Sequence, residues 1–211
     1  PLMEYAGPLF VVVTARVLGF SLMQISAARI GTAALAAYQV LITVFTIFAF
    51  VSAPLSQIAQ SILPPIVDRG DSRECRRACL NIIGMAVPTA FVVSAICFLT
   101  LRFGATLFTS DLAVLSEVYR STFAIFLAAA TLLVSSAIDG ALLAAKDFSF
   151  IIPAQLSVCA FQCGLLYLVN QMGGGLPEVL LTFSVRLWCF LLLALGRILL
   201  GKGPLGRVLL P

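Results

Sequence analysis

Three charged side chains lie within long apolar stretches of the sequence, where a charge is costly and often has a function. They are Arg16 in VVVTARVLGF, Asp139 in SSAIDGALLAAKDF and Arg186 in TFSVRLWCF. Arg16 requires a carboxylate, carbonyl groups or water around it. We expect it to face a cavity, with Asp139 as its candidate partner if their helices touch; hydrogen bonding to helix-end carbonyls is the alternative. For Arg186 we expect the side chain to extend outward to the membrane interface.

Asp139 has two interpretations. A carboxylate inside a membrane can titrate and bind a coupling proton or sodium ion, which makes Asp139 the candidate for ion coupling. Alternatively, Asp139 is structural and bonds to a neighbouring helix, while Lys146 extends to the interface. Lys146 follows seven residues later, on the same helical face. The sequence leaves both interpretations open.

Uncharged polar residues form a second group of candidates for lining a cavity: Gln24, Gln39, Ser56, Gln57 and Gln60. Such side chains commonly make hydrogen bonds between membrane helices, and a polar substrate path is the sharper alternative. The last three residues follow Pro54, which frees a backbone carbonyl about one turn earlier. We therefore expect Pro54 to act as a hinge, with a wet cavity or a helix contact beyond the bend.

Enzyme chemistry is disfavoured by the residue types. The chain has no His and six Cys, so no zinc-binding spacing is present, and the Cys residues are expected to act as small apolar side chains. Intramembrane serine proteases need a Ser–His pair, and metal-dependent membrane hydrolases need His or paired carboxylates in their spans. We expect no enzymatic activity, no metal and no cofactor other than a coupling ion, H⁺ or Na⁺.

The elements that position these residues are membrane spans. Hydrophobic residues make up 61% of the 211 residues and charged residues 10%, whereas a soluble domain has about 45–50% and about 25%. The apolar runs are long and continuous, unlike the alternating strands of a barrel, so they predict helices. The fold class is all-α, a polytopic membrane protein with six spans at approximately 8–28, 33–64, 79–103, 113–143, 148–170 and 177–200.

The second span is too long for a straight crossing. Its 32 residues would reach about 48 Å, against about 30 Å of hydrocarbon. We expect it to tilt, to bend at Pro54 or to protrude, and to end at Pro64-Pro65.

The distribution of basic residues predicts the orientation in the membrane. Only Arg29 and Arg102 follow the first, third and fifth spans, whereas a larger set follows the second, fourth and sixth: Arg69, Arg73, Arg76, Arg77, Lys146, Arg197, Lys202 and Arg207. Basic loops face the cytoplasm or an equivalent compartment, so both chain ends are expected on the cytoplasmic or stromal side. The basic residues occupy three loops without interleaved aromatic residues, so we expect no nucleic-acid partner.

Two stretches resemble MATE (multidrug and toxic compound extrusion) transporters, in particular their DinF-like branch of bacteria and plant plastids. AARIGTAALAAYQVLITVFTIFAFVSAPLSQIAQSILPPIVDRGD, residues 27–71, resembles the region of the seventh and eighth helices. It includes an AR-x-G turn, an AAYQ helix start at 36–39, and Gln60 near the helix end. IDGALLAAKDFSFI, residues 138–151, resembles the acidic-Gly segment with a basic–acidic pair that ends the tenth helix. Arg16 falls where plant-type members often carry an arginine.

The resemblance covers nearly the whole chain and implies the C-terminal six-helix lobe of a twelve-helix antiporter. The family pairs two lobes around a central cavity that alternates its access. Such proteins export small organic compounds, often cationic or amphipathic, in exchange for protons or sodium ions, and thereby carry out multidrug or xenobiotic efflux. The partners implied are membrane lipid, an organic substrate and an N-terminal lobe that we expect to be absent from residues 1–211. The plastid envelope and the plasma membrane both fit.

The chain departs from the family pattern at the coupling site. Many DinF-like members carry a carboxylate on the eighth helix, whereas residues 52–56 read SAPLS without an acid. The family's main coupling carboxylate lies on the first helix of the N-terminal lobe. The role of Asp139 in coupling or in structure therefore stays open.

Two alternatives to an antiporter lobe remain. Lipid-linked oligosaccharide flippases of the same superfamily typically have cavities rich in cationic residues, of which Arg16 is one. A pore or a structural protein that dimerises is the other; a channel would tend to show rings of polar residues or a filter loop, and we find neither in the sequence.

Overall fold

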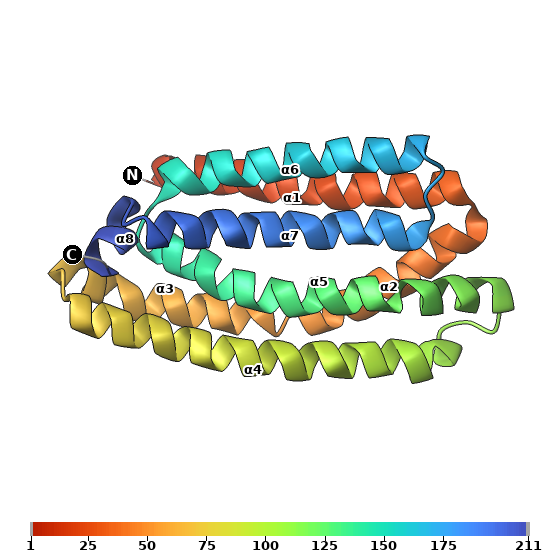
Figure 1. The fold of residues 1–211 in the computed structure, drawn as a ribbon, viewed down its shortest axis with the longest axis horizontal. Coiled ribbons are helices and arrows are strands. Elements are labelled where there is room, and N and C mark those ends of the chain that lie inside the picture. The colour runs from red at the N-terminus through yellow and green to blue at the C-terminus, as the bar shows by residue number, and fades with distance from the viewer. Residues whose placement is uncertain (1, 210–211) are drawn as a thin grey trace.

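The computed structural model describes residues 2–209, and every regular element within them is a helix, which confirms the all-α prediction (Figure 1). In the described part of the chain, seven α-helices precede a short C-terminal one, with a single 3-10 turn after the fourth. Their bounds are α1 Leu2–Ile30, α2 Thr32–Ala49, α3 Ser52–Arg69, α4 Ser72–Gly104, η1 Ala105–Leu107, α5 Leu112–Ala144, α6 Phe148–Gln171, α7 Leu176–Leu199 and α8 Gly203–Leu209.

Six stretches in the described part of the chain are long and apolar enough to cross a membrane, which confirms the prediction of a multi-pass membrane protein. The spans run longer than expected: α4 and α5 have 33 residues each, or about 50 Å at about 1.5 Å per residue. The polar ends of these helices thus extend beyond the hydrocarbon layer. At the start of α4, Asp71 accepts hydrogen bonds from the N–H groups of Arg73 and Glu74, both at 3.0 Å, which caps the helix.

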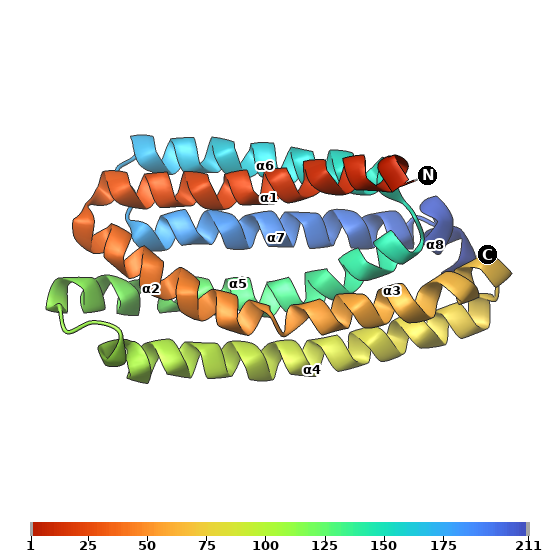
Figure 2. The same ribbon diagram turned by 180° about the vertical axis from the view of Figure 1, so that it is seen from behind.

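The second predicted span consists of two helices, because the chain bends between α2 and α3 (Figure 2). Pro54 occupies the third position of α3 and cannot donate to the carbonyl of Phe50, one turn earlier. The N–H of Ala53 bonds to that carbonyl instead, at 3.2 Å, and the hydroxyl of Ser52 donates to the carbonyl of Ala49 at 2.6 Å. The bend therefore lies just before Pro54, where the freed carbonyl is.

The prediction that Pro64-Pro65 ends this span is wrong. Both prolines lie inside α3, which continues to Arg69 and ends at Gly70, with φ 69°. The carbonyl groups that the two prolines leave without a donor belong to exposed residues four positions earlier. Solvent can satisfy such carbonyls, so the helix tolerates the two missing bonds.

Helix α5 is the centre of the bundle and contacts α2, α3, α4 and α7. Helix α1 packs mainly on α6, and α6 also packs on α7. Figures 1 and 2 show that the start of α1, the α3–α4 turn, the α5–α6 turn and α8 all lie at one end of the bundle. We call this the basic end, because the larger set of basic residues named above lies there. Arg120, near the start of α5, pairs with Glu117 at the opposite end.

Candidate functional site

A cavity of ≈ 300 Å³ lies among α1, α2, α5, α6 and α7. Rings from three helices form much of its wall: Phe20, Phe45, Phe183 and Phe190. The charged and amide side chains that line it are Arg16, Asp139, Gln155 and Arg186. The structure thus brings the three intramembrane charges of the sequence into one cavity, which the sequence alone did not predict for Arg186.

Arg16 and Asp139 form an ion pair across α1 and α5. Nη2 of Arg16 donates to Oδ2 of Asp139 at 2.8 Å, between residues 123 positions apart. The Asp139 side chain is 12% exposed and that of Arg16 41% exposed. The second carboxylate oxygen, Oδ1, is buried and has no hydrogen-bond partner within residues 2–209. The pair is therefore held by one hydrogen bond, and Oδ1 of Asp139 can still accept another.

Lys146 does not take part in this site. Helix α5 ends at Ala144, and Lys146 follows it as an exposed residue with φ 55°. Asp139 does bond to a neighbouring helix, as the structural interpretation requires, but it does so inside a cavity, as the ion-coupling interpretation requires. The geometry is compatible with both.

Arg186 is buried, so the expectation that it extends to the interface is wrong. Its residue is 5% exposed, and its guanidinium carbon lies 4.9 Å from the ring centroid of Phe183 and 6.0 Å from that of Phe20. These ring faces attract the cation. Arg186 has no ion pair in the part of the chain that the structure describes. Its direction follows from the face of α7 that it occupies, which is turned toward α1.

Gly19 makes room for Arg186 on the neighbouring helix. A methyl group at Gly19 would lie 2.6 Å from Nη1 of Arg186 and 2.9 Å from Oε1 of Gln162. Gln162 is fully buried, and neither of its amide atoms has a hydrogen-bond partner among the described residues. The glycine lets α1 approach these two polar side chains closely, and a larger residue would require their flexible ends to shift.

The sequence analysis missed the two glutamines of α6. Gln155 and Gln162 are both buried, and they are seven residues apart, so they lie on one helical face. This spacing inside an apolar segment is the signal that would have revealed a polar stripe turned toward the bundle interior.

The uncharged polar residues that the sequence suggested as a cavity lining do not line this cavity. Gln24, Gln39 and Gln57 are exposed, and so is Pro54. Ser56 is half-buried, and its hydroxyl accepts a hydrogen bond from the Gln60 amide at 3.0 Å. The polar residues beyond the bend thus bond to each other on α3.

Ser56 nevertheless helps to position Asp139, because its backbone packs against Gly140, the next residue on α5. A methyl group added to Gly140 would lie 2.6 Å from the carbonyl oxygen of Ser56 and 2.8 Å from its Cα. Helices α3 and α5 therefore cross in backbone contact directly beside the ion pair. This crossing follows the bend, so the bend helps to determine where Asp139 stands.

The charge of the cavity wall is positive. Two arginines and one aspartate line it, which gives a formal charge of 2 − 1 = +1. No group of His, Cys, Asp and Glu that could hold a metal occurs within the described residues. Aromatic faces, a buried cation and a breakable ion pair suit reversible binding of an organic molecule.

No family model matches the chain. Among curated proteins, Protein DETOXIFICATION 47, chloroplastic, from Arabidopsis thaliana is 28% identical over 221 aligned residues. The alignment includes 94% of this chain and 38% of that relative, so the chain spans well under half of the relative's length. Together with the six apolar helices, this relative confirms the resemblance to MATE transporters that the sequence motifs indicated.

Proposed function

Starting from this relationship, we propose that the chain is one six-helix lobe of a MATE-type secondary antiporter. The complete transporter would move small organic molecules across a membrane in exchange for protons or sodium ions. The observation that carries the proposal is the Arg16–Asp139 pair, which lines a cavity and leaves one carboxylate oxygen without a hydrogen-bond partner among the described residues. A second lobe, N-terminal to this one, would supply the opposite wall, and the plastid envelope is the membrane that the relative's name favours.

Asp139 is the coupling residue in this proposal. A proton on the carboxylate removes its negative charge, which weakens the 2.8 Å contact with Arg16. A sodium ion would instead bind at Oδ1 and compete with Arg16 for the same carboxylate. In either case the partly exposed guanidinium of Arg16 becomes available to a substrate, so ion binding and substrate binding alternate.

The wall favours amphipathic substrates with a neutral or negatively charged polar group. The resemblance implies cationic compounds as well, but two arginines face this cavity, and protonation of Asp139 would raise the formal charge from +1 to +2. The rings of Phe20, Phe45 and Phe183 offer apolar surface to a planar molecule. A flat organic anion could therefore pack its rings against the phenylalanines and pair its negative charge with the arginines of this wall.

A lipid-linked oligosaccharide flippase is the second candidate. The observation in its favour is that Arg186 shares the cavity with Arg16, because flippases of this superfamily typically have cavities rich in cations. The two proposals differ in coupling: binding of a proton or a sodium ion at Asp139 matters only for the antiporter. Imposed pH and sodium gradients therefore separate them.

Transport in proteoliposomes that contain the full-length protein tests the proposal. The probes are a naphthalenesulfonate anion and the ethidium cation, each driven by an imposed pH gradient. We expect gradient-driven transport of the anion, its loss in Asp139→Asn, and its retention in Glu117→Gln. Glu117 is the matched control, because it is also on α5 and paired with an arginine, but it lies outside the cavity.

Either of two results would contradict the proposal. Transport that ignores the pH and sodium gradients would exclude antiport, and a normal rate in Asp139→Asn would exclude this residue from coupling. Residues 1–211 alone should not transport, since one wall cannot alternate access.

A further inference from the structure

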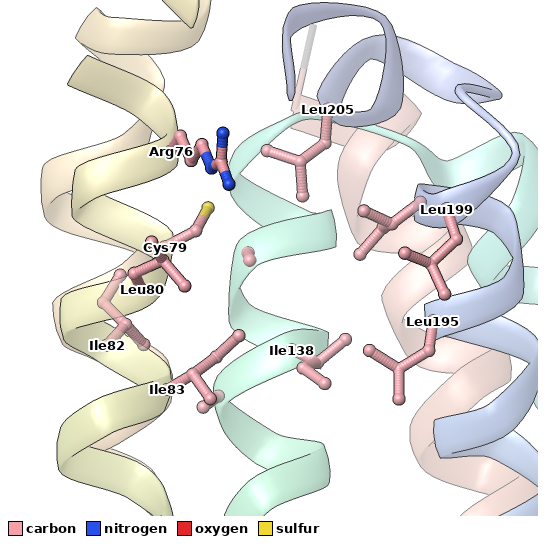
Figure 3. A pocket seen from close by; sticks show the side chains of 12 residues that line it. Arg76, Cys79, Leu80, Ile82, Ile83, Ile138, Leu195, Leu199 and Leu205 are labelled. Atoms are coloured by element: carbon pink, nitrogen blue, oxygen red, sulfur yellow. The ribbon is translucent and has the colours of Figure 1, made fainter. Parts of the chain in front are cut away.

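A second cavity, of ≈ 370 Å³, lies at the basic end on another side of α5 (Figure 3). Its walls come from α4 and α7, its floor from α5 and its roof from Leu205 of α8. None of the described side chains of α1, α2, α3 and α6 contributes to its lining. We call it the α4–α7 groove, and it is separate from the ion-pair cavity.

The groove is apolar and opens sideways. Leu80 on α4 is 58% exposed and Leu199 on α7 is 72% exposed, and Figure 3 shows them on opposite sides of the groove. The floor carries the small side chains of Ala137 and Ala141, so the surface between the walls is hollow. All these residues belong to membrane-spanning helices, whose exposed apolar surface contacts lipid acyl chains.

One charge stands at the mouth of the groove. Among the residues that the structure describes, Arg76 is the only charged one that lines the groove, and Figure 3 shows its guanidinium directed toward the roof residue Leu205. Arg76 is exposed and has no ion pair within residues 2–209. Leu80 and Ile83 follow at i+4 and i+7, on the same face of α4. One helical stripe therefore changes from cationic to apolar as it enters the membrane.

The surroundings of the mouth carry excess positive charge. The basic residues on the neighbouring turns of α4 and on the segment from α7 into α8 are Arg73, Arg77, Lys202 and Arg207, and the acidic ones at the start of α4 are Asp71 and Glu74. Asp71 is already engaged in capping α4. An unpaired arginine within this surplus attracts a negatively charged group.

We propose that the α4–α7 groove binds an anionic membrane lipid. One acyl chain lies between Leu80, Ile83 and Leu195, and Arg76 donates hydrogen bonds to the phosphate of the headgroup. Guanidinium and phosphate match in geometry and charge. The inference does not rest on the proposed transport function, because no described residue lines both the groove and the ion-pair cavity.

Lipid titration with the full-length protein tests this proposal. The purified, delipidated protein is titrated with phosphatidylglycerol and phosphatidylcholine of identical chains, and bound lipid is counted by native mass spectrometry. We expect about a fivefold preference for phosphatidylglycerol, the factor that corresponds to one basic residue at an anionic lipid surface. Arg76→Gln should remove the preference. Ile83→Trp should reduce binding of both lipids, because the indole ring fills part of the groove.

Arg77→Gln is the matched control. It removes the same charge from the adjacent residue, which is exposed but lies about 100° around the helix and does not line the groove. This variant should keep the preference. Equal binding of the two lipids by the unchanged protein would overturn the proposal. An equal loss in Arg77→Gln and Arg76→Gln would also overturn it, because the preference would then belong to the basic surface as a whole.

Discussion

Two aspartate–arginine pairs, whose aspartates are eight residues apart along the chain, differ in geometry. Asp147, in the turn between α5 and α6, receives two bonds from Arg197 of α7: Nε to Oδ2 at 2.6 Å and Nη2 to Oδ1 at 2.9 Å. Ser149 donates a further bond to Oδ1 at 3.2 Å. The Phe150 ring lies 4.7 Å from the guanidinium carbon of Arg197. Both carboxylate oxygens of Asp147 thus accept hydrogen bonds, and the guanidinium of Arg197 contacts both the carboxylate and an aromatic ring.

The pair in the cavity is bound less completely. Arg16 reaches Asp139 through one nitrogen, and Oδ1 of Asp139 has no hydrogen-bond partner in the described residues. The Asp147 side chain is 3% exposed and its arginine 23%, whereas Arg16 is 41% exposed. A bidentate buried pair resists opening, and a single contact to a partly hydrated arginine opens easily. We infer that the first pair fastens the α5–α6 turn to α7, while the second is built to exchange partners.

The largest expected effect is on the fastened pair. Asp147→Ala leaves Arg197 without its carboxylate in a largely buried place, so the free energy of unfolding should fall by about 3–5 kcal/mol. Unfolding of the full-length protein by SDS titration, followed by circular dichroism, measures the loss. The double variant Asp147→Ala/Arg197→Leu should recover part of it, because no uncompensated charge remains. If Asp147→Ala lowered the free energy of unfolding less than Asp139→Asn does, the Asp147–Arg197 pair would not be the more stabilising of the two.

A smaller effect is expected where the backbone positions the Arg16–Asp139 pair. Gly140→Ala places a methyl group 2.6 Å from the Ser56 carbonyl oxygen, so α3 and α5 must separate. Such overpacking costs about 1–3 kcal/mol, and it should displace Asp139 from Arg16 and slow transport. Gly164→Ala is the control, since a methyl group there meets nothing within 4 Å. Equal stability and transport in the two variants would show that the helix crossing does not position the site.

Asp139→Asn should lower stability less but abolish coupling. The remaining Arg16 is partly exposed and can be hydrated, so we expect a loss of about 1 kcal/mol or less. Transport in proteoliposomes should lose its dependence on the pH gradient. A stability loss as large as that of Asp147→Ala would identify Asp139 as a structural residue, the interpretation that the sequence also left open.

The sequence predicted the parts of this comparison that depend on local chemistry. Charges inside apolar runs identified Arg16 and Asp139 as candidate partners, because a membrane leaves an unpaired charge few alternatives. The direction of Arg186 was not predictable in the same way. It depends on Gly19 and Phe20 of α1, which are distant in sequence and adjacent only after the helices pack.

The effects of the prolines were likewise predictable only where they depend on local chemistry. Pro54 predicted a bend, which is present, because the missing donor acts one turn away. Pro64-Pro65 did not end α3, because the carbonyls they free belong to exposed residues within the helix, where solvent can satisfy them. Whether such a carbonyl finds another donor depends on its surroundings, which the sequence does not contain.

The smallest effect on stability is expected at a third, exposed ion pair, which provides a reference for the other two. Glu117 and Arg120 lie three residues apart on α5, with nitrogen and oxygen 3.3 Å apart and the Arg120 side chain 66% exposed. Glu117→Gln should change the free energy of unfolding by only about 0.2–0.5 kcal/mol, since water replaces the lost partner. SDS titration against Asp139→Asn measures the difference. If the two variants agree in stability yet only Asp139→Asn loses gradient-driven transport, the cavity pair contributes to coupling far more than to folding.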